Sequence, residues 1–305
     1  MNNSGLMAQL KDSLELLLFH AIKLFTRACP RFLCLAAGRI IGCIFYIFGK
    51  KHRSLALSNL KIAFGQEKPL SELKKISRKS FQHFGEFLID FIKFSVTNDQ
   101  KKEGLAVIEG KKYLEDALKK GKGVLLFSAH YGNWEIASFL LSKSGKLNVV
   151  ARPLDNKNLE KKLLELRRTL GAQVVYKFDA TRQILRKLRA NEMVAILIDQ
   201  NVLRSQAVFV DFFGKKAATT PSLATFSLRT GAPIIPLFCY PLSPHPYYVR
   251  IGKPIDISLK GDYKEDILKI TQQCTNIIEE QIRQNPIYWL WFHNRWKTRP
   301  KNNKE

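Results

Sequence analysis

The chain is short of acidic residues. Asp and Glu number 26 against 50 Lys and Arg, which gives a formal net charge of +24 at pH 7. Such an excess implies an anionic partner, which could be nucleic acid, anionic lipid or an acidic protein. Cysteine is also scarce: the five cysteines form no C-x-x-C pair, so neither a zinc site nor a disulfide framework is supported. We expect reduced, buried thiols, as suits a cytosol-facing protein.

A long uncharged apolar run is missing as well. The longest, Ile40 to Gly49, is too short to span a bilayer, and residues 32–49 could span only by tolerating Arg39. No small-residue cleavage site follows a short apolar segment, so we do not expect a removed signal peptide. We interpret residues 1–53 as basic amphipathic helices that associate with the membrane interface. The alternatives are one marginal span or a helical layer of a soluble core.

The rest of the chain has the composition of a folded domain. With 305 residues and 46% hydrophobic residues, it can bury one sizeable core and is not disordered. We assign residues 54–300 to one domain and 301–305 to a polar tail. Residues 54–121 have helical periodicity. From Gly123 onward, strands are predicted at 124–127, 147–151, 173–176, 193–198, 234–239 and 247–251, and helices at 133–141, 158–170, 181–189, 221–229 and 263–283. This alternation predicts an α/β fold, a mostly parallel sheet flanked by helices.

The stretch from Phe127 to Glu135 has the pattern of strand, tight turn and helix. The turn holds His130, and Glu135 follows it with four residues between, in the first turn of the helix. A neutral imidazole can remove a proton from a hydroxyl when a carboxylate fixes its tautomer and stabilises the imidazolium. The first N–H groups of the helix, near Asn133, have no partner within the helix and can bind an oxyanion. We therefore predict His130 and Glu135 as catalytic residues; the alternative is that both are structural.

Three different side chains directly follow strand ends: His130, Arg152 and Asp199. Carboxyl ends of parallel strands meet at one edge, where open α/β sheets carry their sites. Arg152 can bind a phosphate or stabilise an oxyanion, or it is a surface loop arginine. Asp199 opens the sequence Asp-Gln-Asn at 199–201 and can orient His130 or bind a substrate hydroxyl. His130 thus has two possible carboxylate partners, and we favour Glu135.

Three further segments combine apolar and charged residues. Residues 211–221 indicate a loop with a helix start, whose Phe212 and Phe213 either touch a lipid chain or cover the core. The helix predicted at 158–170 has a basic face that is solvated or docks an acidic protein or a phosphate. The tail at 288–300 interleaves aromatic and cationic residues, which suits a headgroup interface, a phosphorylated sugar or a stacked nucleic acid.

These blocks resemble the late lipid A biosynthesis acyltransferases, the lauroyl/myristoyl-type branch of the lysophospholipid acyltransferase superfamily. The resemblance covers nearly the whole chain. It rests on SAHYGNWE at 128–135, ARPLDN at 151–156, LRRTLGAQVV at 166–175, DQN at 199–201, VDFFGKKAATTP at 210–221, GAPIIP at 231–236 and WLWFHNRWKTRP at 289–300. The wider superfamily usually has Asp at the position of Glu135. A glutamate there is similar to the lipid A branch. The tail departs slightly, with Asn294 and Trp296 where a second arginine and a smaller aromatic are expected.

The resemblance implies an O-acyltransferase at the cytoplasmic face of the inner membrane. The donor would be an acyl carrier protein thioester, and the acceptor a hydroxyl on a phosphorylated glycolipid, a lipid A precursor. His130, held by Glu135, would act as general base, and no cofactor or metal is required. Substrate binding or oxyanion stabilisation is assigned to Asn133, Arg152, Arg167, Asp199 and Gln200.

Two alternative functions remain compatible with the sequence. One keeps the chemistry but uses acyl-CoA and a glycerophospholipid or phosphoglycolipid acceptor. The other is a non-catalytic basic module that binds membrane or nucleic acid; the charge permits it, but basic residues are spread along the chain without a recognised nucleic-acid motif, so no nucleic acid is expected.

Overall fold

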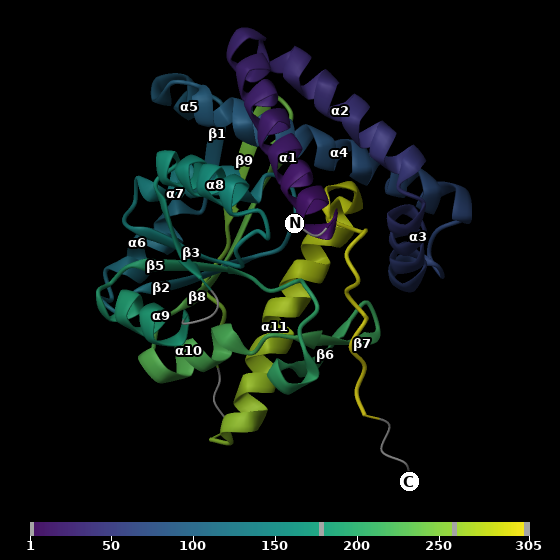
Figure 1. Ribbon diagram of the computed structural model, residues 1–305. Coiled ribbons are helices and arrows are strands. Elements are labelled where there is room, and N and C mark those ends of the chain that lie inside the picture. Colours follow the sequence, from purple (N-terminus) through teal and green to yellow (C-terminus); the bar gives the residue numbers. More distant parts are fainter. Residues whose placement is uncertain (1–2, 177–179, 258–260, 302–305) are drawn as a thin grey trace.

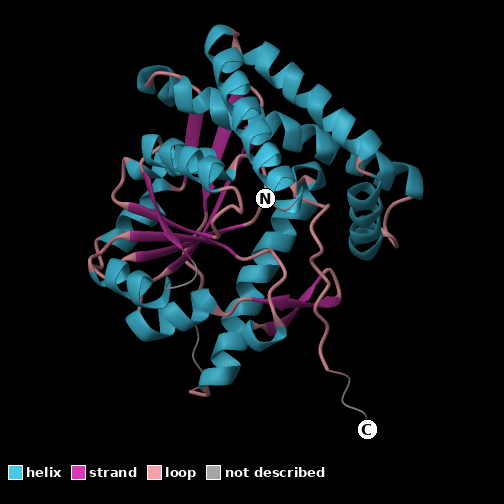
Figure 2. Cartoon of the chain, viewed as in Figure 1, coloured by secondary structure: helices cyan, strands magenta, loops and turns pink. Residues whose placement is uncertain are grey.

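The computed structural model describes residues 3–176, 180–257 and 261–301 (Figure 1). Helices cover a central sheet, and a helical N-terminal layer lies beside it (Figure 2). The helices are α1 (Asn3–Ala28), α2 (Arg31–Phe48), α3 (Lys50–Phe64), α4 (Leu70–Val96), α5 (Asp99–Gly104), α6 (Lys111–Leu118), α7 (Trp134–Ser142), α8 (Lys157–Thr169), α9 (Ala180–Arg189), α10 (Ser222–Thr230) and α11 (Tyr263–Gln284). Short 3-10 helices are η2 (Arg204–Gln206) and η3 (Pro286–Tyr288).

The strands are β1 (Ala106–Glu109), β2 (Val124–Ser128), β3 (Leu147–Ala151), β4 (Ala172–Tyr176), β5 (Met193–Leu197), β6 (Val208–Phe212), β7 (Lys215–Thr219), β8 (Ile234–Leu242) and β9 (His245–Ile251). Seven of them form one sheet in the order β1-β9-β8-β2-β5-β3-β4. Neighbours in this sheet are parallel except β8 and β9, which pair antiparallel. The predicted α/β fold with a mostly parallel, helix-flanked sheet is confirmed.

Strand β2 lies at the centre of the core and is buried at every position. Alternate side chains of a strand point to opposite faces. Val124 and Leu126 therefore pack with α4, α6, α7 and α8. Leu125 and Phe127 pack on the other face with α3, α9, α10, α11 and the C-terminal tryptophans. Burial on both faces fixes the position of the loop that follows β2.

The N-terminal layer is joined to the domain by close packing of α2 on α4. A Cβ atom at Gly42 would lie 2.2 Å from the carbonyl oxygen of Phe81, and one at Gly38 would lie 2.6 Å from that of Gly85. The two backbones therefore approach more closely than any side chain would permit. By length and composition, α2 is the one helix in the described ranges that could cross a membrane. Its glycine face, however, is already occupied by α4.

Two local predictions are wrong. Residues 106–109, placed in a helical region, form β1, a short edge strand that pairs with β9. Residues 211–221, expected to be a loop with a helix start, belong largely to the antiparallel hairpin of β6 and β7. Its turn has positive φ at Phe213 (53°) and Gly214 (69°). A two-residue turn of this kind normally shows Asn-Gly or Asp-Gly, so a phenylalanine at the first position gave no turn signal.

Candidate active site

The loop between β2 and α7 is held on both sides by backbone hydrogen bonds. The N–H of Gly132 donates to the carbonyl of Tyr288 (2.9 Å), and that of Asn133 donates to Cys239 of β8 (2.6 Å). Gly132 has a positive φ of 60°, and a Cβ there would lie 2.2 Å from the Cys239 oxygen. Only glycine fits such a turn without strain. The loop therefore fixes the backbone of His130 at the carboxyl edge of the sheet.

His130 and Asp199 lie in contact because β2 and β5 are neighbours and parallel. The imidazole Nδ1 lies 2.9 Å from Oδ1 of Asp199, and the backbone N–H of His130 donates to Oδ2 (3.0 Å). Trp289 adds a third hydrogen bond, from Nε1 to Oδ2 (2.8 Å). The Asp199 residue is only 3% exposed.

The charge state of Asp199 follows from these contacts. Burial alone would raise the pKa of this carboxyl group, but the charge and hydrogen bond of His130, with the donors of Trp289 and the backbone, lower the pKa to about 2. An ionised carboxylate can only accept hydrogen bonds, so Nδ1 of His130 donates to it, and in the neutral form of the ring the lone pair is on Nε2. The Nε2 atom lies 3.2 Å from the side-chain nitrogen of Gln200, which can donate to it. The arrangement provides an oriented imidazole base.

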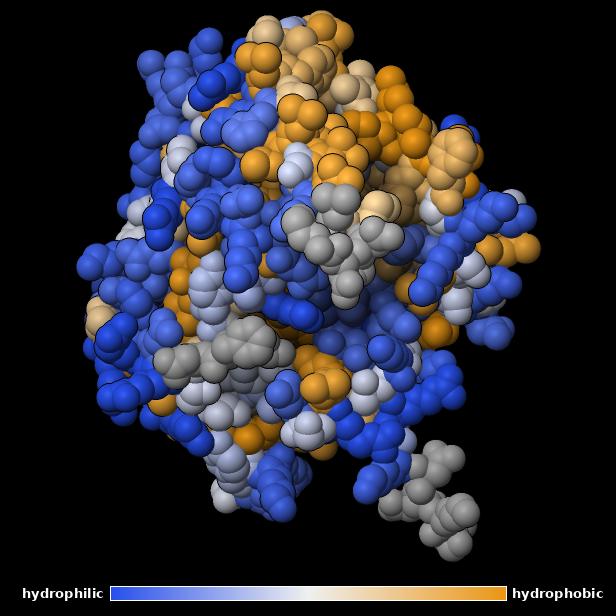
Figure 3. Space-filling model, in the orientation of Figure 1, coloured by the Kyte–Doolittle hydropathy of each residue, from blue (hydrophilic) through white to orange (hydrophobic). Residues whose placement is uncertain are grey.

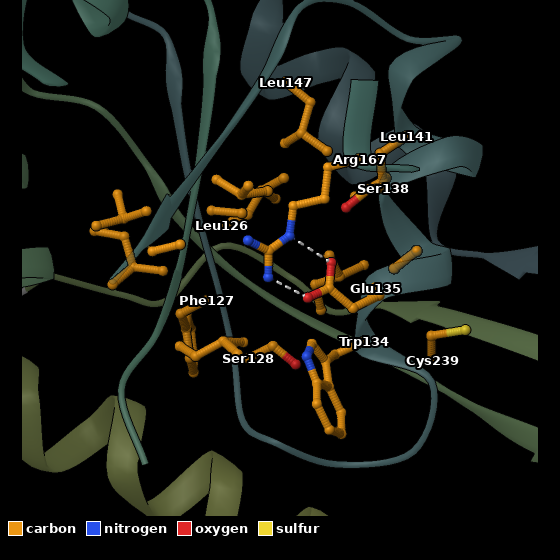
Figure 4. Close-up of a pocket in the computed structure, with 18 residues that line it drawn as sticks. Leu126, Phe127, Ser128, Trp134, Glu135, Ser138, Leu141, Leu147, Arg167 and Cys239 are labelled. Atoms are coloured by element: carbon orange, nitrogen blue, oxygen red, sulfur yellow. Dashed lines mark hydrogen bonds and ion pairs between the residues drawn. The ribbon is translucent and has the colours of Figure 1, made fainter. Parts of the chain in front are cut away.

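Glu135 does not contact His130 in this way, and the preference for it as the partner of His130 is corrected. Arg167 of α8 binds its carboxylate with both Nη2 (2.5 Å) and Nε (3.1 Å), and the pair lies in a cavity (Figure 4). Glu135 lies in the first turn of α7, and its carboxylate points toward Arg167 of α8. The spacing of residues in the sequence could not show whether the Glu135 side chain points toward His130 or toward Arg167.

The cavity around Glu135 and Arg167 is mostly apolar. It has a volume of about 70 Å³ and lies between α7 and the strands β2, β3, β5 and β8. Trp134 lines it, and the Trp134 ring lies 5.2 Å from that of His130. The Nη1 atom of Arg167 is buried and has no hydrogen-bond partner among the described residues. An apolar space beside an oriented base suits a hydrocarbon chain.

The other predicted site residues have different surroundings. Arg152 is exposed after β3, at the same edge as His130, without a hydrogen bond or ion pair to any residue in the described ranges. The backbone N–H of Asn133 is not free for an oxyanion, because Cys239 accepts it. The next N–H groups, of Trp134 and Glu135, belong to the first turn of α7 and have no partner within the helix. Such N–H groups can bind an anion.

The tryptophans and Arg295 of the C-terminal segment form part of the core, which contradicts the expectation of an exposed interface for them, whereas Lys297 and Arg299 are exposed. Trp289, Trp291, Trp296 and Arg295 are all buried. Arg295 donates to the carbonyl of Ala218 (2.7 Å), and burial lowers its pKa to about 10. The tail thus supports the site from behind, with Trp289 holding Asp199.

The contacts of Trp289 with Asp199 and of His293 with Asn201 were not predicted from the sequence. His293 Nε2 accepts the backbone N–H of Asn201 (3.0 Å) and so holds the turn after Asp199. Their position inside a block that resembles a family was a signal, but nothing in the residue types indicated burial. Phe212 and Phe213 likewise cover the core. No cluster of His, Cys, Asp and Glu in the described ranges could hold a metal ion.

Comparison with known proteins gives consistent matches. A family model described as bacterial lipid A biosynthesis acyltransferase matches residues 10–298. The chain is 25% identical over 224 residues to a phosphatidylinositol mannoside acyltransferase of Mycobacterium tuberculosis, covering 71% of this chain and 69% of the relative. It is 26% identical over 268 residues to the lipid A biosynthesis palmitoleoyltransferase of Escherichia coli K12, covering 86% and 84%. The lipid A biosynthesis myristoyltransferase of the same organism is 22% identical over 264 residues, covering 86% and 79%.

Proposed function

The chain belongs to the bacterial lipid A biosynthesis acyltransferase family, and on that premise we propose that it transfers a fatty acyl chain from an acyl carrier protein thioester to a hydroxyl of a phosphorylated glycolipid, a lipid A precursor. It is an acyltransferase by family. The observation that carries the proposal is the contact of His130 with the buried carboxylate of Asp199. A fixed, neutral imidazole with a free lone pair is what deprotonation of a hydroxyl needs.

In this mechanism the acceptor hydroxyl takes the place of the Gln200 amide at Nε2 of His130. Nε2 removes the hydroxyl proton while the oxygen attacks the thioester carbon, and a tetrahedral oxyanion forms. The imidazolium is stabilised by Asp199, which stays ionised. The intermediate then expels the thiolate, which takes the proton from His130, so that an ester and a free thiol result. No covalent acyl-enzyme is formed.

Charge development on the thioester oxygen needs donors close to the site. The N–H groups of Trp134 and Glu135 are the ones we assign, with the exposed Arg152 as an additional cation at the same edge. The apolar cavity beside Trp134 is assigned to the start of the acyl chain. Glu135 then has a positioning role: by binding Arg167 with two hydrogen bonds it keeps the guanidinium fixed in the cavity wall.

The preference for a carrier-protein donor rests on charge. Carrier proteins are acidic, and this chain has a net charge of +24. On α9, the side chains Arg182, Arg186 and Arg189 are exposed at helical spacing and form no ion pair with any described residue. Such a stripe favours an acidic protein by electrostatic attraction. Donation from acyl-CoA is the competing possibility, which parallel assays with both thioesters separate.

Membrane association is supported by an apolar surface over α1 and α2 (Figure 3). On α1 it includes Leu10, Leu14, Leu17, Leu18 and Leu24; on α2 it includes Phe32, Ile40, Ile44, Ile47 and Phe48. Exposed apolar area of this size indicates a membrane or protein contact. Because α4 covers the glycine face of α2 and Asp90 binds Arg31, we assign α2 to the interface rather than to a span. The cytoplasmic face of the inner membrane is where the thioester donor is available.

The test is transfer by purified His130→Ala protein with a labelled carrier-protein thioester and a lipid A precursor. Loss of a general base should lower turnover on the order of 10²–10⁴-fold. Turnover close to that of the wild type would exclude His130 as the base.

A further inference from the structure

A second cavity, which we call the α2–α4 pocket, lies apart from the apolar cavity of Figure 4. It has a volume of about 580 Å³ and is bounded by α2, α4, η3 and the β8–β9 hairpin. Arg31 and Arg39 of α2, Lys79 and His83 of α4 and Asn133 of the active-site loop line it. The mechanism proposed above uses none of the α2 and α4 residues.

His83 and Asn133 both line this pocket, and each has a buried side-chain atom with no hydrogen-bond partner among the described residues. These atoms are Nε2 of His83, whose residue is 8% exposed, and Oδ1 of Asn133, whose residue is 3% exposed. Leaving such groups unsatisfied costs about 1–3 kcal/mol each. Burial lowers the pKa of His83 to about 4, against the opposing effect of the Gly132 backbone, so the ring is neutral near pH 7. A hydroxyl group suits both positions because it donates and accepts.

The charged residues of the pocket favour an anion. Arg31 is bound to Asp90 and Arg39 to Glu86, so those two cations are balanced. Lys79 is exposed and forms no ion pair within the described ranges, so one positive charge remains. Lysine is a common phosphate ligand. Hydroxyl-binding groups deep in the pocket and a cation at its rim together match a phosphorylated sugar.

The pocket is connected both to the base and to the apolar surface. Asn133 belongs to the same loop as His130. Phe87, which lines the pocket, stacks on Trp134 with ring centroids 3.9 Å apart, and the Trp134 ring lies 5.2 Å from His130. On α2, the residues at 31 and 39 line the pocket while Ile40, Ile44 and Ile47 are exposed. A headgroup in the pocket would therefore lie at the depth of lipid headgroups, beside the catalytic loop.

We propose that the α2–α4 pocket binds the phosphorylated sugar headgroup of the acceptor lipid, with His83 and Asn133 binding hydroxyls and Lys79 binding phosphate. The proposal rests on the proposed acyl transfer and adds the acceptor subsite. The headgroup of a bulk anionic phospholipid also carries a phosphate. The experiment therefore has to distinguish binding of the acceptor headgroup from binding of bulk phospholipid.

The experiment compares Lys79→Glu with Lys74→Glu, which makes the same charge change at an exposed position of α4 that does not line the pocket. Steady-state transfer is measured with a phosphorylated acceptor and with its dephosphorylated form. Lys79→Glu should raise the KM for the phosphorylated acceptor on the order of tenfold, leave the donor KM unchanged and have little effect on the dephosphorylated acceptor. His83→Phe should raise the KM for both acceptors, since it removes a hydroxyl partner.

Direct binding separates failure of this inference from failure of the proposed function. Glucosamine 1-phosphate is titrated into the full chain by calorimetry, which needs no turnover. Binding that Lys79→Glu weakens and Lys74→Glu preserves supports the subsite even if transfer is not observed. Active enzyme whose KM for the phosphorylated acceptor is the same in both lysine variants contradicts it. A loss of binding to phosphatidylglycerol vesicles in Lys79→Glu, with that KM unchanged, would assign the pocket to bulk lipid and also overturn it.

Discussion

Asp199 accepts two hydrogen bonds from the same residue, one from the ring of His130 and one from its backbone N–H. The pair of contacts fixes both the tautomer and the position of the imidazole, and it comes from two neighbouring parallel strands rather than from one helix. Glu135, which is closer in sequence, is bound to Arg167 instead. The two carboxylates therefore contact different partners: Asp199 binds His130, and Glu135 binds Arg167 in the wall of the apolar cavity.

Trp289→Phe should weaken catalysis through Asp199. The substitution removes the hydrogen bond from Nε1 to Oδ2, a bond to a charged group worth about 1.5–3 kcal/mol. We expect kcat to fall several-fold with little change in KM. Trp291→Phe is the matched control, because Trp291 is buried in the same cluster but donates to the carbonyl of Pro286. Equal kcat values in the two variants would argue against the role of Trp289.

Stability should fall as the pH is lowered through the range from about 6.5 to 4. Burial lowers the pKa of His83 and of His293 to about 4, whereas an unfolded histidine titrates near 6.5. In this window the unfolded state binds more protons, so the free energy of unfolding rises with pH by up to about 1.4 kcal/mol per unit for each residue. Denaturant unfolding at pH 4.5 and 7 measures the slope, and His293→Gln should reduce it. A flat profile would contradict the burial of neutral rings.

Gly42→Val should destabilise the N-terminal layer. Its Cβ would meet the Phe81 carbonyl at 2.2 Å, so α2 would have to move away from α4. Overpacking of this kind costs about 1–3 kcal/mol or more. Gly104→Ala is the control, since no atom lies within 4 Å of a Cβ there. Thermal unfolding measures both, and equal melting temperatures would show that α2 does not pack as described.

Replacement of Ile40, Ile44 and Ile47 by serine should weaken binding to lipid vesicles without unfolding the chain. All three side chains are exposed, so their loss costs the folded state little, while each buried isoleucine side chain contributes about 1.5–3 kcal/mol to insertion. Co-sedimentation with phosphatidylglycerol vesicles measures the effect. Leu203→Ser, an exposed apolar position outside the N-terminal layer, serves as the control. Unchanged sedimentation of the triple variant would rule out this surface as the membrane contact.

The sequence predicted the α/β fold because strands and helices alternate with clear periods from Val124 to Gln284. It also placed His130 and Asp199 at one edge, since both directly follow strands that turned out to be neighbours. The pairing order of strands is set by long-range contacts. The sequence therefore could not decide whether Asp199 or Glu135 is the partner of His130. The prediction for the aromatic tail failed for a related reason. A sequence in which tryptophans alternate with cations is compatible with an exposed interface and with a buried core. The burial of the tryptophans and the hydrogen bond from Trp289 to Asp199 are long-range features that the sequence does not show.

The most direct measurement compares kcat for acyl transfer in Asp199→Asn and Glu135→Gln at equal protein stability. If Asp199 orients the base, Asp199→Asn should lose on the order of 10²–10⁴-fold, because an amide can present its NH₂ group to Nδ1 and favour the wrong tautomer. Glu135→Gln should lose much less, and mainly through Arg167. Near wild-type kcat in Asp199→Asn, with the large loss in Glu135→Gln, would contradict the account.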